Sequence, residues 1–436
     1  MITGHFVDAY TPIVDGVVRT VENYQRFLER DVGPSYVVAP KSPGQPEQPR
    51  VVRFASLPAR HPYRFGVPAL DRSLWSRLAA IPFDIVHAHT PFVSGELARR
   101  VARHTAKPFV FTLHSKYPDW AEHQYASAPA TAVVLGLRTL GGKPRDHRLR
   151  AVDLVRWSPR GRAFAIHAVR SKVWSFASNA DCVLVPSRAI GDELLSYADS
   201  CPAPGPAPRI EIVRQGIDFP VIERAARADA KLRVRARHRV AEGDPLFLYV
   251  GQIAREKQLP FLLDALSALA AMGQRFTMLL VGSGPEERAS KARTRALGID
   301  ERVRFLGTVA SKPELAELYA ASDLFLFPSL YETQGLVVME AASASLPTVG
   351  QIGASGLSDI LEHDRTGFFA ERDPLAYAKL VRSLCANPNH ARAVGQRASE
   401  VVVTAAQAVQ SLSALYRDLA GRRHAPQRAV ADSASL

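Results

Sequence analysis

The chain has 436 residues, of which 47% are hydrophobic, and it carries a formal net charge of +13. This length exceeds what one ordinary core organises, and the apolar content excludes a disordered chain, so we expect two globular domains. The three cysteines are scattered and odd in number, which excludes a disulfide framework and is typical of a reducing compartment. The positive charge predicts an anionic partner: nucleic acid, anionic lipid or a phosphorylated ligand.

The N-terminus lacks a basic stretch that leads into an apolar one, and no apolar run approaches the roughly 18 residues that span a bilayer. We therefore expect a cytoplasmic protein, or one that is peripheral on the inner face of the cell membrane. No zinc-finger spacing, aromatic RNA-binding signature or helix-turn-helix pattern accompanies the charge, and this disfavours nucleic acid as a partner.

In the first half of the chain, short β-branched and aromatic runs alternate with helical patterns. The predicted strands are 36–39, 83–88, 109–113 and 183–185. Strands separated by helices indicate a parallel sheet with crossover connections. The prolines of CPAPGPAPR, residues 201–209, then predict a linker.

The same alternation resumes after this linker. Strands are predicted at 246–250, 276–281, 303–306 and 324–327, with helices at 259–272, 286–297 and 313–321. Two consecutive doubly wound, Rossmann-like α/β domains fit this order best, and we place them at 1–205 and 206–404. We expect a C-terminal helix at 405–420 that returns to the first domain, and a disordered tail at 421–436.

The segment 138–172 is strongly basic. It holds ten Lys or Arg against only Asp146 and Asp153, with Trp157, Phe164 and Ile166 interleaved. Such a segment is typical of an element that lies on a membrane surface, and a solvated insertion is the alternative.

The most informative motif is PSLYETQGLVVMEAA, residues 328–342. It follows an apolar strand and places Glu332 and Glu340 on either side of seven residues, with Gly335 between them. A turn that opens a helix presents free N–H groups and the positive end of the helix dipole to an anion. The two acids suit sugar hydroxyls, so the motif predicts a site for a sugar joined to a diphosphate. The alternative is a capped helix with Glu332 merely solvated.

Three other loops follow strands of the second domain. Gly251 begins a loop that carries Arg255 and Lys257, both able to neutralise a diphosphate. The turn 282–284 follows the next strand, and Gly307 follows the one after, where it lets a base lie against the backbone. Because ligands of open parallel sheets bind beyond the carboxyl ends of the strands, the loops together predict a nucleotide-sugar site.

The first domain offers a turn and three histidines. Asp15 and Gly16 form a turn that is able to approach a ligand. His87 and His89 alternate on one strand and share a face, which allows a metal but is more often packing and hydrogen bonding. His114 ends an apolar strand, where it is placed to touch a sugar hydroxyl or the reacting centre. We predict no metal site.

These motifs resemble the retaining glycosyltransferases of family 4, which have the GT-B fold. The resemblance rests on GQIAREK (251–257), GSG (282–284), RFLG (304–307) and the E-x7-E pair in ETQGLVVMEAA (332–342). YTPIVDGVVRTVENYQRFLER, VHAHTPF and FTLHSKY in the first half resemble the glycine loop and later strand ends of that family. The resemblance runs from residue 1 to 420. The ETQG form is similar to bacterial enzymes that glycosylate diacylglycerol, and phosphoinositide mannosyltransferases share most of these motifs.

The resemblance implies two Rossmann-like domains with a cleft between them, the first binding the acceptor and the second the nucleotide sugar. Glu332 would bind donor sugar hydroxyls, Glu340 the ribose and Lys257 the phosphates. The family usually has an arginine where this chain has Gln252, and whether Arg255 replaces that cation is left open. The resemblance assigns catalysis to His114 and Glu332, and donor binding to Gly16, Gly251, Arg255, Lys257, Gly282, Gly284, Leu306, Thr333, Gln334, Gly335, Leu336 and Glu340.

We therefore expect a retaining hexosyltransferase that uses a UDP- or GDP-linked sugar and a hydroxyl acceptor, a membrane lipid such as diacylglycerol. It would need no cofactor or metal, because its cations neutralise the diphosphate. Four alternatives remain: a mannosyltransferase of phosphoinositides or soluble acceptors, a sugar-nucleotide epimerase, a dinucleotide-dependent oxidoreductase, and a basic protein that binds membrane or nucleic acid without catalysis. The oxidoreductase is disfavoured because no G-x-G-x-x-G follows an early strand.

Overall fold

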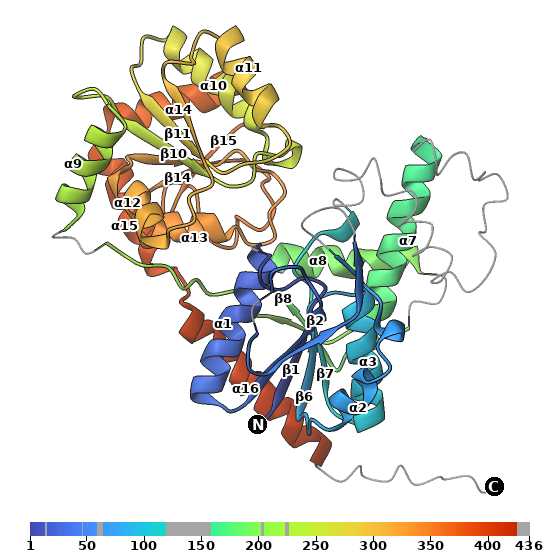
Figure 1. The fold of residues 1–436 in the computed structure, drawn as a ribbon. Helices are drawn as coiled ribbons and strands as arrows, with labels where there is room; N and C mark the ends of the chain where they lie inside the picture. The colour runs from blue at the N-terminus through green and yellow to red at the C-terminus, as the bar shows by residue number, and fades with distance from the viewer. Residues whose placement is uncertain are drawn as a thin grey trace, which may run out of the picture.

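The computed structural model describes residues 1–424 except 14, 46, 59–63, 119–157, 202–204 and 223–225. Two parallel β-sheets, each covered by helices, form two lobes (Figure 1). This arrangement confirms the predicted α/β class with two Rossmann-like domains.

The N-terminal lobe is built on a seven-stranded sheet with the order β3-β2-β1-β6-β7-β8-β9, and its neighbouring strands run parallel. Its strands are β1 (Thr3–Phe6), β2 (Ser35–Pro40), β3 (Val51–Phe54), β6 (Ile85–Ala88), β7 (Phe109–Thr112), β8 (Cys182–Val185) and β9 (Ile210–Ile212). A separate antiparallel pair joins β4 (Ser56–Pro58) and β5 (Arg64–Gly66). The helical segments of this lobe are α1 (Gly16–Asp31), η1 (Pro68–Leu70), α2 (Leu74–Ala79), α3 (Val93–Thr105), α7 (Pro159–Ala177), α8 (Arg188–Ser196) and η2 (Tyr197–Ser200).

The C-terminal lobe is built on a six-stranded parallel sheet with the order β12-β11-β10-β13-β14-β15. Its strands are β10 (Leu246–Val250), β11 (Thr277–Val281), β12 (Val303–Gly307), β13 (Leu324–Leu326), β14 (Thr348–Gln351) and β15 (Phe368–Ala370). Its helical segments are α9 (Arg227–Arg237), η4 (Arg255–Lys257), α10 (Leu259–Ala271), α11 (Glu287–Ala296), α12 (Lys312–Ala321), α13 (Leu336–Ser343), α14 (Pro374–Ala386) and α15 (Pro388–Glu400), and the chain continues into α16 (Ala405–His424).

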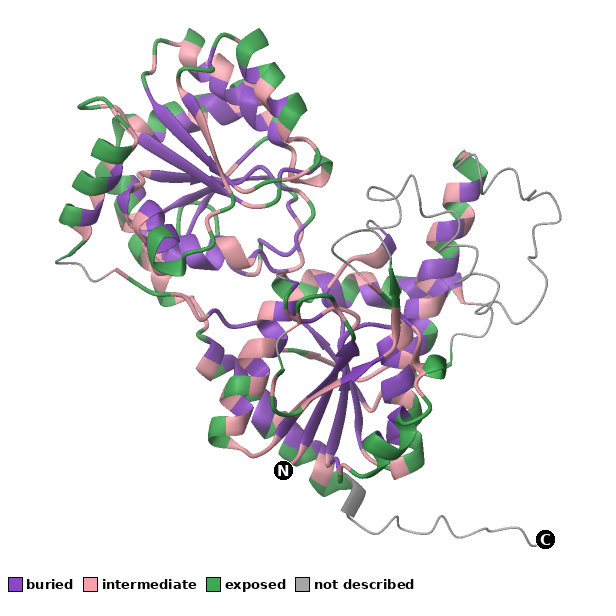
Figure 2. Cartoon of the chain, in the orientation of Figure 1, coloured by how far each residue is buried: buried purple, intermediate pink, exposed green. Residues whose placement is uncertain are grey.

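The central strands of both sheets are buried, as Figure 2 shows, whereas the edge strands β9 and β12 are mostly half-buried and the outer faces of the helices are exposed. Every residue of β10 and β11 is buried, and both strands read as nearly continuous apolar runs. Helices on both faces of a parallel sheet require such runs, which explains why these strands were predicted from the sequence. Strands β1 and β14 were not predicted, because their sequences, TGHF and TVGQ, mix glycine and polar residues with few apolar ones.

The predicted boundary after residue 205 lies too early. Strand β9 follows it in the chain and pairs with β8, so Ile210–Ile212 completes the edge of the N-terminal sheet. The prolines that suggested a linker precede an edge strand. Proline has no N–H to donate to neighbouring strands, so within sheets it is found at edge strands and at the starts of strands. A proline-rich stretch is therefore compatible with the approach to an edge strand.

The C-terminal helix α16 packs against α1 of the N-terminal lobe (Figure 1). Val409, Leu412 and Tyr416 share a buried cluster with Tyr24 and Leu28. The helix reaches His424, so the first residues of the predicted tail are helical. The remainder of that tail lies outside the described residues.

The basic segment 138–172 is described only from residue 158 onward, and the rest of it lies outside the described residues. Its last part forms most of α7, which Ser158 caps by accepting a hydrogen bond from the Gly161 N–H at 3.2 Å. Among the helices of the described chain, none combines the length and apolar content needed to cross a membrane.

Candidate active site

The loop between β13 and α13 lies at the carboxyl end of the C-terminal sheet and faces the N-terminal lobe (Figure 1). Gly335 ends this loop with a φ of 75°, a left-handed conformation that glycine adopts without strain. A Cβ at this position would lie 2.7 Å from a methyl carbon of Leu357, so both conformation and space require glycine. The turn directs the free N–H groups at the start of α13 out of the sheet edge, as an anion site needs.

Glu332 and Lys257 form an ion pair in this loop region. The Lys257 Nζ lies 2.6 Å from the Glu332 Oε1, and the two side chains are 20% and 11% exposed. Lys257 comes from η4, which follows β10, the strand next to β13 in the sheet. The two predicted donor-binding groups therefore neutralise each other in this structure. Arg255, at the start of η4, is exposed, and Gln252 is exposed beside it.

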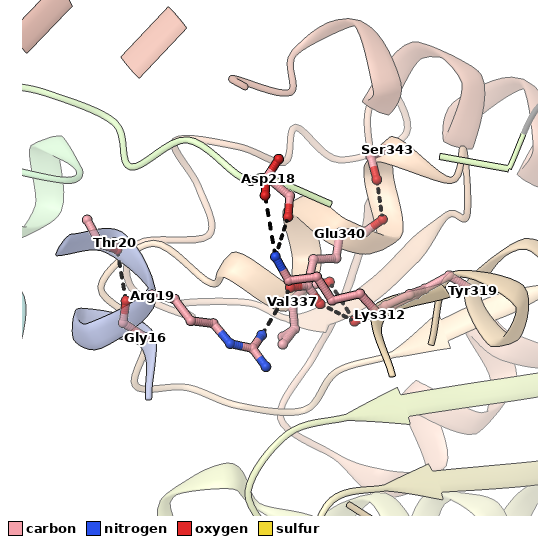
Figure 3. A network of polar contacts seen from close by, with 9 residues as sticks. All are labelled: Gly16, Arg19, Thr20, Asp218, Lys312, Tyr319, Val337, Glu340 and Ser343. Atoms are coloured by element: carbon pink, nitrogen blue, oxygen red, sulfur yellow. Dashed lines mark hydrogen bonds and ion pairs between the residues drawn. The ribbon is translucent and has the colours of Figure 1, made fainter. Parts of the chain in front are cut away.

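Glu340 lies on α13 and is 6% exposed. Its Oε2 accepts a hydrogen bond from the Tyr319 hydroxyl at 3.0 Å, and its Oε1 lies 3.7 Å from the Arg19 Nη1 (Figure 3). Burial raises the pKa of the Glu340 carboxyl, while the Tyr319 hydroxyl and the Arg19 and Lys312 charges hold that rise back. A buried carboxylate with few partners is suited to accept hydrogen bonds from ligand hydroxyls.

Arg19 belongs to α1 of the other lobe, so this contact joins the two lobes. Its neighbour Gly16 begins α1, where Asp15 caps the helix by accepting from the Val18 N–H at 2.8 Å. A Cβ at Gly16 would lie 3.7 Å from a methyl carbon of Leu336, so these two predicted site residues are adjacent across the lobes.

A second cross-lobe contact runs through Asp218, which follows β9. Its carboxylate lies 2.7 Å from the Arg26 Nη2 of α1. The same carboxylate lies 3.4 Å from the Lys312 Nζ of α12 (Figure 3). Arg19 and Tyr319 were not predicted from the sequence as partners of Glu340. The available signal for Arg19 was its position one helical turn after Gly16, a predicted site residue on the same helix.

Gly251, Gly282 and Gly284, which are predicted donor-binding residues, lie in two loops that pack closely together. A Cβ at Gly282 would lie 1.8 Å from the Gly251 carbonyl oxygen, and one at Gly284 would lie 2.2 Å from the Ile253 carbonyl oxygen. Both loops lie at the carboxyl ends of neighbouring strands, so this packing shapes the edge of the site. Leu306 is half-buried at the end of β12, in the next strand along.

Thr333 and Gln334 connect the loop between β13 and α13, which we call the donor loop, to the N-terminal lobe. The Ser187 hydroxyl donates to the Thr333 carbonyl oxygen at 2.9 Å. Gln334 is 2% exposed and pairs with the main chain of Gln215: its Oε1 accepts from the Gln215 N–H at 2.6 Å, and its Nε2 donates to the Gln215 carbonyl oxygen at 2.7 Å.

His114 follows β7 and is 4% exposed. Its Nδ1 lies 2.6 Å from the Gln215 Nε2, and its Nε2 lies 2.8 Å from the His89 Nδ1. Burial lowers the pKa of His114 to about 3, so the ring is neutral. Both ring nitrogens have protein partners, so a substrate that contacts His114 must replace one of them. His87 and His89 share a face as predicted, with ring centroids 4.1 Å apart.

Two family models match the chain. Residues 231–401 match the model described as glycosyl transferases group 1, and residues 14–220 match the model described as glycosyltransferase family 4. The two ranges correspond to the two lobes.

Among curated proteins, the chain is 28% identical over 361 residues to a sulfoquinovosyl transferase of Arabidopsis thaliana, covering 81% of this chain and 60% of that protein. It is 24% identical over 400 residues to an alpha-monoglucosyldiacylglycerol synthase of Streptococcus pneumoniae, covering 89% and 79%. It is 27% identical over 424 residues to a D-inositol 3-phosphate glycosyltransferase of Catenulispora acidiphila, covering 92% and 90%.

Among solved structures, the fold is similar to that of Anabaena HepE in complex with UDP and glucose, with a TM-score of 0.68 and 16% identity over 96% of this chain and 100% of that one. Each of the two matched family models falls within one of the two lobes. The chain belongs to the family 4 glycosyltransferases of the GT-B fold, enzymes that transfer a sugar from a nucleotide sugar.

Proposed function

We propose that this glycosyltransferase moves a hexose from a UDP- or GDP-linked donor to a hydroxyl of a membrane lipid such as diacylglycerol, with retention of the anomeric configuration. The relatives named as monoglucosyldiacylglycerol synthases, one of which covers 89% of the chain, support the lipid acceptor. In this proposal the enzyme works at the cytoplasmic face of the membrane.

The observation that carries the proposal is the placing of two acids and their cations around the start of α13. Glu332 and Lys257 lie together in one lobe, and Glu340 faces Arg19 of the other lobe. A nucleotide sugar supplies the complements of all these groups. Its hydroxyls donate to the two carboxylates, and its diphosphate replaces the carboxylates as the partner of the cations.

When the nucleotide sugar binds, the ion pair between Lys257 and Glu332 is replaced by contacts of each residue with the donor, so neither charge is left isolated. When the diphosphate binds Lys257, Glu332 loses its cation and gains hydroxyl donors from the hexose. A buried charge left without any partner costs several kcal/mol, on the order of 3–5, so this exchange favours a ligand that carries both groups. Inorganic phosphate alone satisfies only one of the two.

In the transfer step, the bond between the anomeric carbon and the diphosphate oxygen breaks while the acceptor oxygen bonds to the same face of that carbon. The acceptor proton passes to the departing phosphate oxygen, so the products are a glycoside and a nucleoside diphosphate. Negative charge grows on that phosphate, and Lys257 and the N–H groups at the start of α13 stabilise it. The cations of the site neutralise the diphosphate, so the proposal includes no metal, and Arg255 is the additional cation available there.

A second acceptor class has its own support. The relative named as a D-inositol 3-phosphate glycosyltransferase covers 92% of this chain, and another is named as a GDP-mannose-dependent alpha-mannosyltransferase. A phosphoinositide or a soluble inositol phosphate is therefore the alternative acceptor, with mannose as the alternative sugar.

The test is release of nucleotide by the purified protein. UDP- and GDP-hexoses are each offered with vesicles that contain diacylglycerol or phosphoinositide, and with soluble inositol phosphate. We expect release with one donor and one acceptor class, and formation of an α-linked product. A protein that releases no nucleotide with any pair, or that yields the inverted product, contradicts the proposal.

Glu332→Ala tests the site itself. It removes the acceptor of the sugar hydroxyls and leaves Lys257 unpaired, so we expect kcat to fall by on the order of 100-fold or more. Glu242→Ala is the matched control, because Glu242 is exposed at a turn of the same lobe. Equal turnover of the two variants would exclude the role of Glu332.

A further inference from the structure

Gln215 lies where the donor loop, α1 and His114 meet. It follows β9 and is 5% exposed. Its main-chain N–H and carbonyl oxygen pair with the side-chain amide of Gln334, at 2.6 and 2.7 Å. Its own side chain contacts the N-terminal lobe: the Nε2 lies 2.6 Å from the His114 Nδ1, and the Oε1 lies 3.2 Å from the Thr20 hydroxyl, which donates to the Gly16 carbonyl oxygen at 2.8 Å.

The chemistry of this amide sets the direction of a hydrogen-bond chain. An amide nitrogen only donates, so the Gln215 Nε2 donates to the His114 Nδ1. A neutral imidazole that accepts at Nδ1 carries its proton on Nε2, and the His114 Nε2–H then donates to the His89 Nδ1 at 2.8 Å. In the same way the His89 Nε2–H donates to the His5 Nδ1 at 3.0 Å. We name His5, His89 and His114 the histidine chain.

The order of the strands brings the three rings together. β1, β6 and β7 are neighbours in the sheet, and each supplies or precedes one histidine of the chain. The far end of the chain is the His5 Nε2, which is buried and has no hydrogen-bond partner within the described residues. Among the residues that the structure describes, the histidine chain has a hydrogen-bond partner at its Gln215 end only.

A metal site is the competing explanation. His5, His87 and His89 offer ring nitrogens that lie within 4.8 Å of one another. However, His87 uses both nitrogens, with the Tyr416 hydroxyl and the Thr112 hydroxyl each at 2.6 Å. His89 uses both of its nitrogens in the histidine chain. A metal would have to displace these partners, so the contacts favour the chain.

We propose that Gln215 is a positioning residue: its side chain holds His114 as the Nε2–H tautomer, and its main chain links this state to Gln334 of the donor loop. The inference rests on the proposed glycosyl transfer, because it concerns how His114 is presented to the donor site. The chain therefore offers an acceptor nitrogen, Nδ1, to whatever group replaces Gln215. Only a ligand group that donates, such as a hydroxyl, satisfies that nitrogen.

The tautomers can be read directly by nitrogen-15 NMR of the full-length protein labelled at histidine, with no substrate present. In the parent protein we expect His114, His89 and His5 to carry their protons on Nε2. Gln215→Glu replaces the donor by an acceptor and should move a proton to Nδ1 of His114. Gln215→Leu should leave His114 in mixed tautomers, and Gln396→Leu, at an exposed position of α15, should change nothing.

Kinetics supply the second measurement. Gln215→Leu should lower kcat by on the order of 10- to 100-fold while KM for the nucleotide sugar changes little, because the ring is misplaced and donor contacts remain. An Nδ1–H proton on His114 in the parent, or an unchanged His114 signal in both Gln215 variants, overturns the inference. So does one equivalent of bound metal that is lost in His5→Phe. If the parent shows the tautomers but no transfer, the proposed function fails and the positioning by Gln215 stands.

Discussion

Mild acid should destabilise the N-terminal lobe, because its buried histidines are neutral when the protein is folded. Burial lowers the pKa of His5 and of His114 to about 3. Burial and the neighbouring rings also lower the pKa of His87 and His89 well below the usual value. In the unfolded chain each histidine titrates near about 6.5.

The sign follows from proton uptake. Between about pH 6.5 and pH 3 the unfolded chain binds protons that the folded lobe excludes, so the free energy of unfolding falls as the pH falls. At about pH 5, a histidine with a folded pKa near 3 costs about 2 kcal/mol relative to neutral pH. His5 and His114 together lower the free energy of unfolding by about 4 kcal/mol, a large fraction of typical domain stability.

Urea unfolding followed by tryptophan fluorescence measures this effect selectively, because all four tryptophans precede residue 175. His5→Gln removes one histidine that takes up a proton on unfolding. The slope of unfolding free energy against pH should therefore fall by about 1.4 kcal/mol per pH unit between about pH 4 and 6. His167→Gln, at an exposed position of α7, is the control. A slope that His5→Gln leaves unchanged would refute the buried neutral state of His5.

Three further predictions concern the site. Arg19→Ala removes a charge that lowers the pKa of Glu340, so the acid limb of the pH–rate profile should move to higher pH. The control Arg30→Ala, at an exposed position of α1, should leave that limb in place. At Gly282, φ is 134° and a Cβ would lie 1.8 Å from the Gly251 carbonyl oxygen. Gly282→Ala should therefore lower the free energy of unfolding, measured by calorimetry, by more than about 2 kcal/mol. Equal stability of the variant and the parent protein would contradict the loop packing. Dialysis against EDTA should leave nucleotide release unchanged, and a loss restored by Mg²⁺ or Mn²⁺ contradicts charge neutralisation by side chains alone.

Much of the fold could be predicted from the sequence, because burial on both faces imposes a local pattern. The runs 246–250 and 276–281 are apolar except for Thr277, and a local pattern of this kind is enough to predict a buried strand. The turn at Gly335 and the two acids around it are also local, since a strand, a glycine and a helix follow one another in the chain. The prediction was weakest where strands are short and polar, as in β1, and where prolines precede β9.

The partners in the site are decided only by the tertiary structure. Glu332 pairs with Lys257, which is 75 residues away, because β10 and β13 are neighbours in the sheet. Glu340 meets Arg19 because α1 of one lobe faces α13 of the other. His114 is buried between His89 and Gln215, and these contacts could not be read from its place after a strand. The sequence by itself determines which segments become strands, helices and turns, since those depend on nearby residues. The order of strands and the approach of the lobes depend on packing across the whole chain, and they decide which charges and rings meet.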